Sequence, residues 1–274
     1  MAVKVILLDL DGTLLTPDKT IAPADYAALE RAAGMGIHIV PATGRFYDAI
    51  PEVVRRLPFV RYVVTVNGAE IFDAQEKKVL RREDLTNEEA VRVYEYLEGL
   101  PVICDAYVEG WGYMSRAHQA RVEEFTSDPH VVAMLRGKRT PVDDMRRLLR
   151  ERRVQKIMAF FKDMDRRALE LKRLPERFPN TAVSSSIANN IEVNAARANK
   201  GDALKALCGL LGVDVAHSMA FGDGSNDLTM LRAAGIGVAM GNAAPEVQAA
   251  ADYVTRTNEE GGVSAALEKF VFEH

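Results

Sequence analysis

Short apolar runs alternate with amphipathic stretches at both ends of the chain. Residues 3–9 form a mainly apolar run without polar alternation, which is typical of a parallel strand buried on both faces. Residues 23–33 predict a helix, because Pro23 stands at its start and Gly34 follows its end. Similar runs that close on small polar residues predict strands at 3–9, 36–45, 61–69, 217–227, 235–243 and 251–255. This order predicts a doubly wound, Rossmann-like α/β fold with a parallel sheet.

The middle of the chain has a different pattern. Thr86 and Glu89 form the sequence of a helix capping box, and residues 102–114 alternate as an antiparallel hairpin would. Further strands are predicted at 154–161 and 180–186, with helices between them. We therefore expect an α+β domain at 82–188, inserted into a core domain made of 1–81 and 189–274.

Composition narrows the class of protein. The 274 residues are 48% hydrophobic and carry a net charge of −4, which does not favour binding to nucleic acid or to an anionic membrane. Cys104 and Cys208 stand far apart, so neither a disulfide framework nor a zinc site is indicated. No apolar run reaches the roughly 18 residues of a membrane span, and no secretion signal is recognised. We expect a cytoplasmic protein, and the sequence does not indicate its oligomeric state.

Two features of the middle region allow more than one interpretation. Residues 136–177 hold 15 Lys and Arg against 7 Asp and Glu, which fits either a basic lid for an anionic substrate or solvated helices with i,i+4 ion pairs. We favour the helices for most of these residues. The aromatic residues Tyr107, Trp111 and Tyr113 fit hairpin packing better than a substrate platform.

Polar residues cluster where the predicted parallel strands end. Asp9, Asp11, Asp223 and Asp227 follow two of these strands, and the carboxyl ends of parallel strands share one edge of a sheet. Two unit charges about 4 Å apart repel by roughly 4 kcal/mol at an effective dielectric of about 20, so these carboxylates need a cation. Oxygen ligands without His or Cys favour Mg²⁺, and Lys200 at a helix start supplies a second cation.

Further residues at this edge suit an anionic ligand. Thr43 offers a hydroxyl, and glycines allow backbone N–H groups to approach a ligand closely. Arg45 and Asn67 either contact substrate or brace loops. The glycines in question are Gly12, Gly44, Gly68, Gly222 and Gly224. Together with the carboxylates and a hard metal ion, these groups predict a phosphoryl-transfer site.

The motifs occur in an order that resembles a known family. The segments DLDGTLL at 9–15, ATGR at 42–45, NGA at 67–69, NKG at 199–201 and GDGSNDLTML at 222–231 resemble those of the haloacid dehalogenase-like phosphatases. The long insertion, with AMGNA at 239–243, resembles the Cof-type branch of that family, which has a large α/β cap.

The resemblance implies a role for each matching residue. Asp9 would be the nucleophile that forms an aspartyl-phosphate, and Asp11 would protonate the leaving oxygen and then activate water. Asp9, Asp11 through its backbone carbonyl, Asp223 and Asp227 would surround Mg²⁺. Asp11 would keep its proton beside so much negative charge, while Mg²⁺ and Lys200 keep Asp9 ionised. The phosphate or substrate would contact Gly12, Thr43, Gly44, Arg45, Asn67, Lys200 and Asn226.

We therefore expect a Mg²⁺-dependent phosphatase acting on small phosphorylated metabolites such as sugar phosphates. A sugar phosphomutase with the same aspartyl-phosphate, or a non-catalytic module that binds phosphorylated metabolites, are alternatives. A glycosyltransferase that uses Asp-x-Asp to hold a metal is less favoured, because it leaves Lys200 and the second acidic run unexplained.

Overall fold

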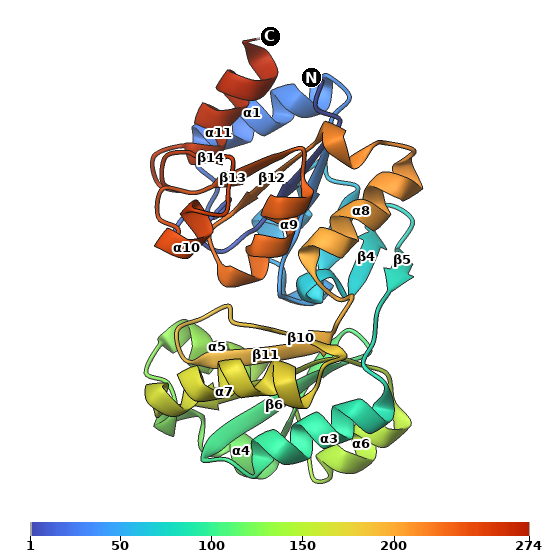
Figure 1. Ribbon diagram of the computed structural model, residues 1–274, viewed down its shortest axis with the longest axis vertical. Coiled ribbons are helices and arrows are strands. Elements are labelled where there is room, and N and C mark those ends of the chain that lie inside the picture. Colours follow the sequence, from blue (N-terminus) through green and yellow to red (C-terminus); the bar gives the residue numbers. More distant parts are fainter. Residues whose placement is uncertain (1, 274) are drawn as a thin grey trace. The chain divides into compact units, whose positions relative to one another are not determined.

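The chain forms two compact units in a computed structural model that describes residues 2–273 (Figure 1). The core unit contains Met1–Arg82 and Asn199–His274, and the inserted unit contains Glu83–Ala198. The first boundary lies one residue after the expected one, and the second lies ten residues after it. The second boundary differs because strand β11 (Asn190–Ala195) pairs with β9 (Val154–Phe161) and β10 (Thr181–Ser184) of the inserted unit.

The core unit is built on a parallel sheet with the strand order β14-β13-β12-β1-β2. Leu8 of β1 stands opposite Phe221 of β12 and Pro41 of β2, so these strand ends are level. The strands are β1 (Val5–Leu8), β2 (His38–Pro41), β12 (Ser218–Gly222), β13 (Ile236–Ala239) and β14 (Tyr253–Val254). The expected parallel α/β core is confirmed, and its level strand ends define one edge.

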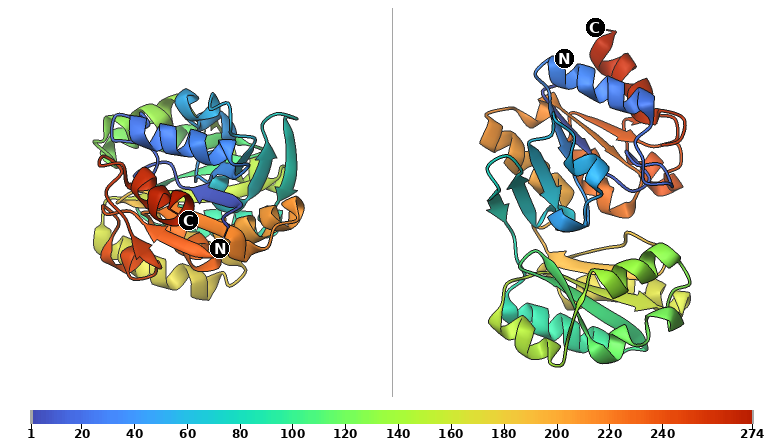
Figure 2. Two further views of the ribbon diagram at one scale, coloured as in Figure 1. Left: turned by 90° about the horizontal axis from the view of Figure 1, so that it is seen from above. Right: turned by 180° about the vertical axis from the view of Figure 1, so that it is seen from behind.

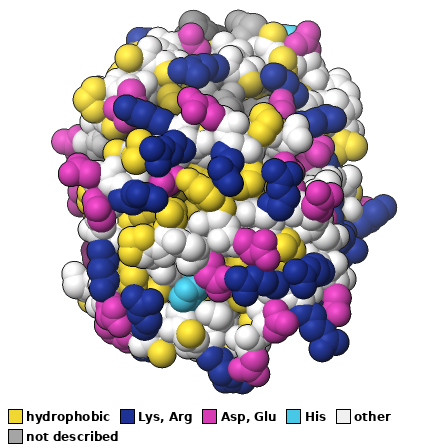
Figure 3. Space-filling view, turned by 60° about the horizontal axis from the view of Figure 1, so that its bottom comes forward, with side chains coloured by type: hydrophobic (Ala, Val, Ile, Leu, Met, Phe, Trp, Pro, Cys, Tyr) yellow, Lys and Arg dark blue, Asp and Glu magenta, His cyan; other side chains and the backbone are white. Residues whose placement is uncertain are grey.

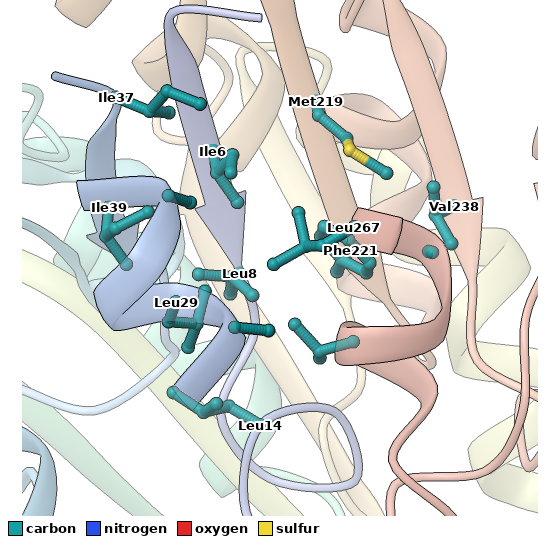
Figure 4. Close-up of a cluster of buried hydrophobic side chains, with 14 of the residues drawn as sticks. Ile6, Leu8, Leu14, Leu29, Ile37, Ile39, Met219, Phe221, Val238 and Leu267 are labelled. Atoms are coloured by element: carbon teal, nitrogen blue, oxygen red, sulfur yellow. The ribbon is translucent and has the colours of Figure 1, made fainter. Parts of the chain in front are cut away.

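Helices cover both faces of this sheet, which explains the unbroken apolar runs of its strands. Ile6 and Leu8 pack with Leu29 of α1 (Pro23–Gly34) and Leu267 of α11 (Gly262–Leu267), as Figure 4 shows. Figure 2 shows α1 beside the C-terminal helix. Val5 and Leu7 point to the other face, against α8 (Lys200–Leu211) and α9 (Leu228–Ala233). The core unit is therefore a three-layer structure around β1 and β12.

Strand β3 (Tyr62–Thr65) differs from expectation. It forms an antiparallel sheet with β4 (Glu70–Asp73) and β5 (Lys78–Arg82), and its parallel contact with the chain after β2 is a single bridge between Ala42 and Val64. The reason is the turn at Val66–Gly68, which sends the chain straight back instead of into a crossover helix. A side chain at Gly68 would meet the backbone of Asn199, and its φ of +103° also favours glycine.

The inserted unit is a mixed sheet with helices on one face. Its neighbouring strands are antiparallel except for β8 (Thr140–Val142), which pairs in parallel with the strand beside it. Its strand order is β10-β11-β9-β6-β7-β8, and the predicted hairpin is β6 (Val102–Val108) with β7 (Trp111–Ser115). Tyr94, Leu149 and Leu174 come from helices α3 (Asn87–Glu98), α6 (Met145–Glu151) and α7 (Met164–Arg177), and pack on the sheet. Thr86 is the N-cap of α3, as expected, and its side chain accepts a hydrogen bond from the Glu89 N–H at 3.2 Å.

The remaining elements are short. They are α2 (Glu52–Arg55), α4 (Arg116–Gln119), α5 (Pro129–Gly137), β8 (Thr140–Val142) and α10 (Pro245–Gln248). No helix within residues 2–273 is both long enough and apolar enough to span a membrane.

Candidate active site

The two acidic motifs meet because β1 and β12 are neighbours. Asp9 directly follows β1 and Asp223 directly follows β12, and the Asp9 N–H donates to the carbonyl of Phe221 at 3.0 Å. The side chains leave the strands at their carboxyl ends, where ligands bind in open parallel sheets. The expected pairing of these distant residues is therefore present in the structure.

Lys200 connects Asp9 to Asp227. The lysine is the first residue of α8, its side chain is fully buried, and its ammonium donates to Asp9 Oδ1 and, at 2.6 Å, to Asp227 Oδ1. The helix start is held by Asn199, whose side chain accepts from the Asp202 N–H at 2.8 Å. A buried ammonium is tolerated only beside negative charge, so Lys200 is part of the acidic cluster and not a surface lysine.

The second oxygen of Asp227 orders the loop that carries Asp223. Asp227 Oδ2 accepts from the backbone N–H groups of Asp223 at 3.0 Å and Gly224 at 2.9 Å. Thr13 donates its hydroxyl to Asp223 Oδ1 at 2.7 Å. Asp223 is thereby held from the β1 side as well as from its own loop.

Three carboxylates form a cluster that could hold a metal ion. Asp9, Asp223 and Asp227 each offer one oxygen, and these oxygens lie within 4.8 Å of one another. With all three ionised and Lys200 protonated, the cluster keeps two negative charges, which one divalent cation would balance. The donors are oxygens only, as Mg²⁺ prefers. The residues present therefore fit the expected ion.

The pKa values in this cluster reflect burial and mutual repulsion. Burial raises the pKa of Asp9 well above its ordinary range, Lys200 opposes this, and Asp227 and Asp223 add to it. Burial and the charge of Asp227 raise the pKa of Asp223 to about 6. Burial alone would lower the pKa of Lys200, but Asp227 and Asp9 outweigh it and raise that pKa. Without a divalent cation the cluster thus favours taking up protons.

We expect Mg²⁺ binding to weaken as the pH falls below about 6. Because the pKa of Asp223 is raised to about 6, a proton competes with the metal for this ligand at lower pH. The apparent dissociation constant should rise by about tenfold for each pH unit below that value. Calorimetric titration with Mg²⁺ between about pH 5 and about pH 8 measures this effect. An affinity that stays constant across this range would contradict the assignment, and Asp223→Asn should bind Mg²⁺ weakly at every pH.

Asp11 has surroundings that the sequence did not predict. Its carboxylate accepts from Arg45 Nε at 2.8 Å and from a second Arg45 nitrogen at 3.0 Å, and from Lys19 Nζ at 2.7 Å. Burial acts to raise the pKa of Asp11, but the bonds and charges of Arg45 and Lys19 lower it to about 2. The expectation that Asp11 retains a proton through its acidic neighbours is therefore wrong for the free protein. The two cations outweigh those neighbours.

The loops after β2 and β3 form a second part of the edge. Thr43 is buried, and its hydroxyl oxygen accepts from the Arg45 N–H at 3.2 Å. The Asn67 N–H donates to the carbonyl of Thr43 at 2.9 Å, and the Asn67 side chain accepts from Asn226 at 3.3 Å. Gly44 lies between Thr43 and Arg45 in the same loop. These contacts show that Arg45 and Asn67 brace the loops, which is one of the two roles expected of them.

Gly12 and Asn242 complete the surroundings of Asp223. Gly12 has a φ of +91°, and a Cβ at this position would lie 2.3 Å from Asp223 Oδ2. A larger residue would therefore displace the carboxylate. Asn242, in the segment AMGNA, donates to the carbonyl of Gly12 at 2.8 Å. Thr13, Lys19 and Asn242 were not singled out individually from the sequence, although Thr13 and Asn242 lie within motifs that were.

The aromatic and basic features of the inserted unit have local partners. Tyr107 is buried, with Arg139 and Lys156 over its ring, and the Trp111 indole donates to Thr140 at 2.9 Å. Arg152 donates to the Tyr113 hydroxyl at 3.2 Å. These contacts favour packing around the hairpin over a substrate platform.

On the face that Figure 3 presents, Lys and Arg are interspersed with Asp and Glu. Within the basic stretch at 136–177, several side chains form ion pairs. Arg147 pairs with Glu151 at 3.0 Å, and Arg166 pairs with Glu170 at 3.0 Å, both at the expected i,i+4 spacing. Asp143 pairs with Arg116 at 2.8 Å. Arg147 and Arg166 thus lie on helices, as that interpretation requires, whereas Arg139 and Lys156 are buried.

The chain is similar to known proteins over nearly its whole length. Residues 6–267 match the family described as haloacid dehalogenase-like hydrolase. The 5-amino-6-(5-phospho-D-ribitylamino)uracil phosphatase of Bacillus subtilis is 30% identical over 279 residues, covering 98% of this chain and 96% of the relative. The pyridoxal phosphate phosphatase of Escherichia coli is 29% identical over 288 residues, covering 100% and 99%.

Solved structures agree with these sequence relatives. A haloacid dehalogenase-like hydrolase from B. subtilis superposes with a TM-score of 0.84 at 28% identity, covering 98% of this chain and 100% of that one. A sugar phosphatase of HAD subclass IIB superposes with a TM-score of 0.82 at 26% identity, covering 97% and 98%. The likeness extends over both units of the chain.

Proposed function

This chain belongs to the haloacid dehalogenase-like hydrolases and is a phosphatase of that family, and from this premise we propose that it is a Mg²⁺-dependent phosphatase that hydrolyses small phosphate monoesters through an aspartyl-phosphate on Asp9. The observation that carries the proposal is the convergence of Asp9, Asp223 and Asp227 around buried Lys200 at the carboxyl edge of the sheet.

Asp9 is the proposed nucleophile. One carboxylate oxygen attacks phosphorus, the bond between phosphorus and the leaving oxygen breaks, and Asp11 passes a proton to that oxygen. Asp11 then takes a proton from the water that cleaves the aspartyl-phosphate, which releases phosphate and restores both carboxyl groups. Because Asp11 is ionised in the free protein, the proton that it passes on is taken up as the phosphate ester binds.

The surrounding residues hold the reacting groups. Lys200 has three N–H donors, of which two contact Asp9 and Asp227, so the third suits a phosphoryl oxygen. Thr43 accepts from the backbone and can still donate its own hydroxyl hydrogen. Asp9, Asp223, Asp227 and the Asp11 carbonyl would hold Mg²⁺, which supplies positive charge for the developing phosphoryl oxygens. The pocket for the phosphate group and the rest of the substrate would be lined by Gly12, Gly44, Arg45, Asn67 and Asn226.

The substrate class is supported by what the relatives are named for. These are phosphatases of a phosphoribitylaminouracil, of pyridoxal phosphate and of HMP-PP, and a solved neighbour is a sugar phosphatase. Such varied names support small phosphorylated metabolites as a class, with sugar phosphates among them.

We expect phosphate release from members of a phosphorylated metabolite panel, including hexose 1-phosphates and 6-phosphates. Release should require Mg²⁺, stop in excess EDTA and return when Mg²⁺ is restored, because the acidic cluster needs a divalent cation. Free phosphate is the readout, and the sugar products are analysed in parallel. Conversion of a hexose 1-phosphate to its 6-phosphate without phosphate release would identify a mutase, and binding without turnover across the panel would identify a binding module. Release that persists in EDTA would contradict the metal assignment.

A further inference from the structure

Lys19 stands at a backbone position that normally favours glycine. It lies in the loop between β1 and α1, where Leu15 and Ile21 form an antiparallel bridge and the chain turns at residues 16–20. The Thr16 N–H donates to the Thr20 carbonyl at 2.9 Å, and the Lys19 N–H donates to the Thr16 carbonyl at 2.9 Å. The φ of Lys19 is +59°, in the left-handed region that closes such turns. A lysine at this position costs folding free energy that glycine would not.

The side chain of Lys19 has a specific partner. Its Nζ donates to Asp11 Oδ1 at 2.7 Å, while Arg45 donates to both oxygens of the same carboxylate. Arg45 approaches from the loop after β2, and Lys19 approaches from the hairpin turn. Asp11 is therefore held from two loops by three hydrogen bonds. Locally unfavourable residues that persist in a fold are expected where they serve the site, and here the unfavourable position delivers an ammonium to Asp11.

We propose that Lys19 is a positioning residue that holds the Asp11 carboxyl in the orientation for proton transfer to the leaving oxygen. The proposal rests on the proposed function, in which Asp11 is the proton donor. Arg45 also donates to the carbonyl of Ala49 at 3.3 Å, so it holds the carboxyl from the loop after β2. Lys19 adds a second hold from the hairpin turn, which limits movement of the carboxyl together with that loop. Proton transfer depends steeply on geometry, so loss of this hold should affect the step in which the leaving oxygen departs.

The leaving group provides the measurement. An alkoxide is a poor leaving group and needs the proton, whereas a nitrophenolate departs readily without one. Lys19→Gly should therefore reduce kcat/KM for an alkyl phosphate at least about tenfold more than kcat/KM for p-nitrophenyl phosphate. Lys19→Arg keeps a cation and should recover most of the difference. The ratio of the two kcat/KM values is the readout, because a role confined to folding would lower both values equally.

The turn itself allows a stable variant and a matched control. Glycine suits the positive φ, so Lys19→Gly should unfold at or above the temperature of the wild type. Lys77 is also a lysine with a positive φ, +52°, in the exposed turn between β4 and β5 of the same unit. Lys77→Gly removes the same charge and the same strain away from Asp11, so the ratio should stay at the wild-type value.

Two results would overturn the inference. One is an unchanged ratio in Lys19→Gly, and the other is a higher kcat/KM for alkyl phosphates, which would mean that Lys19 restrains Asp11 in an unproductive orientation. If the wild-type protein hydrolyses neither phosphate ester, the proposed function fails instead, so the two failures are distinguishable.

Discussion

Asp9→Asn should abolish phosphate release, with a loss in kcat of at least about 10⁴-fold, because an amide cannot form the covalent intermediate. The substitution is nearly isosteric, and the amide oxygen can still accept a hydrogen bond from Lys200. The variant should therefore fold. Acid-quenched reactions analysed by mass spectrometry should show a phosphate adduct on the peptide that contains Asp9 in the wild type and none in the variant.

A matched control separates the chemistry from a general effect of losing an aspartate. Asp165 is an exposed residue of α7 in the inserted unit, and Asp165→Asn should keep wild-type turnover. A variant Asp9→Asn that retains more than about a hundredth of the activity would exclude Asp9 as the nucleophile, given the usual size of this effect. An adduct on a different residue would lead to the same conclusion.

Lys200→Met should destabilise the protein and abolish turnover together. The ammonium is fully buried between Asp9 and Asp227, so its removal leaves two buried carboxylates without their partner. Breaking a buried pair in this way costs about 3–5 kcal/mol in free energy of unfolding. Urea denaturation in the absence of Mg²⁺ measures the loss. Lys205→Met on the same helix is the control. Lys205 is exposed and its ion pair with Asp202 is long, at 3.8 Å, so this substitution should change stability little.

The pH dependence of this loss has a definite sign. Without Lys200 the carboxyl groups take up protons more readily in the folded state than in the unfolded state, so acid favours folding of the variant. Relative to the wild type, destabilisation should be largest above their pKa values and should shrink as the pH falls through them. Mg²⁺ should stabilise the variant at neutral pH by replacing the missing positive charge. Equal stability of the two proteins across the pH range would contradict the ion-pair account.

The strands of the core and the residues at their ends were predictable because burial on both faces leaves a strong signal. Val5–Leu8 has no polar residue, and the change to Asp9 marks the point where the strand leaves the core. The same reasoning found Thr43 and Asp223. Parallel strands share an edge, so the convergence of these side chains followed from the fold class alone.

The partners of Asp11 were not predictable in the same way. Lys19 lies in a polar stretch that has the ordinary composition of an exposed turn, and only the three-dimensional course of the hairpin directs it toward Asp11. The expected electrostatics of Asp11 were wrong for the same reason. Counting charges near in sequence gives Asp9 the greatest weight, whereas the hydrogen-bonded cations Arg45 and Lys19 decide the outcome.

The second domain boundary was misplaced because of polar residues inside a strand. Strand β11 alternates Ile191 and Val193 with Glu192 and Asn194, and all four are buried. Glu192 pairs with Lys156 of β9 at 3.1 Å, and Asn194 donates to the backbone of β9 at 2.9 Å. Polar residues in this number are typical of a loop or an exposed face. Their cross-strand partners lie far away in sequence, so burial could not be inferred from the segment alone.

The chain order of the core sheet has a consequence for synthesis on the ribosome. Strand β1 must pair with β12, whose residues are made more than 200 positions later, while the inserted unit is one continuous segment between them. Since domains generally fold as units while the chain emerges, the inserted unit should be complete when the core still lacks its central neighbour. During that interval one edge of β1 has no strand β12 paired to it, and the apolar faces of β1 lack the later helices α8, α9 and α11. Exposed apolar surface and unpaired strand edges favour aggregation of such an intermediate. The proposed nucleophile Asp9 precedes both the inserted unit and β12 in the chain, so its site can form only after β12 and the loop that carries Asp223 and Asp227 have been made.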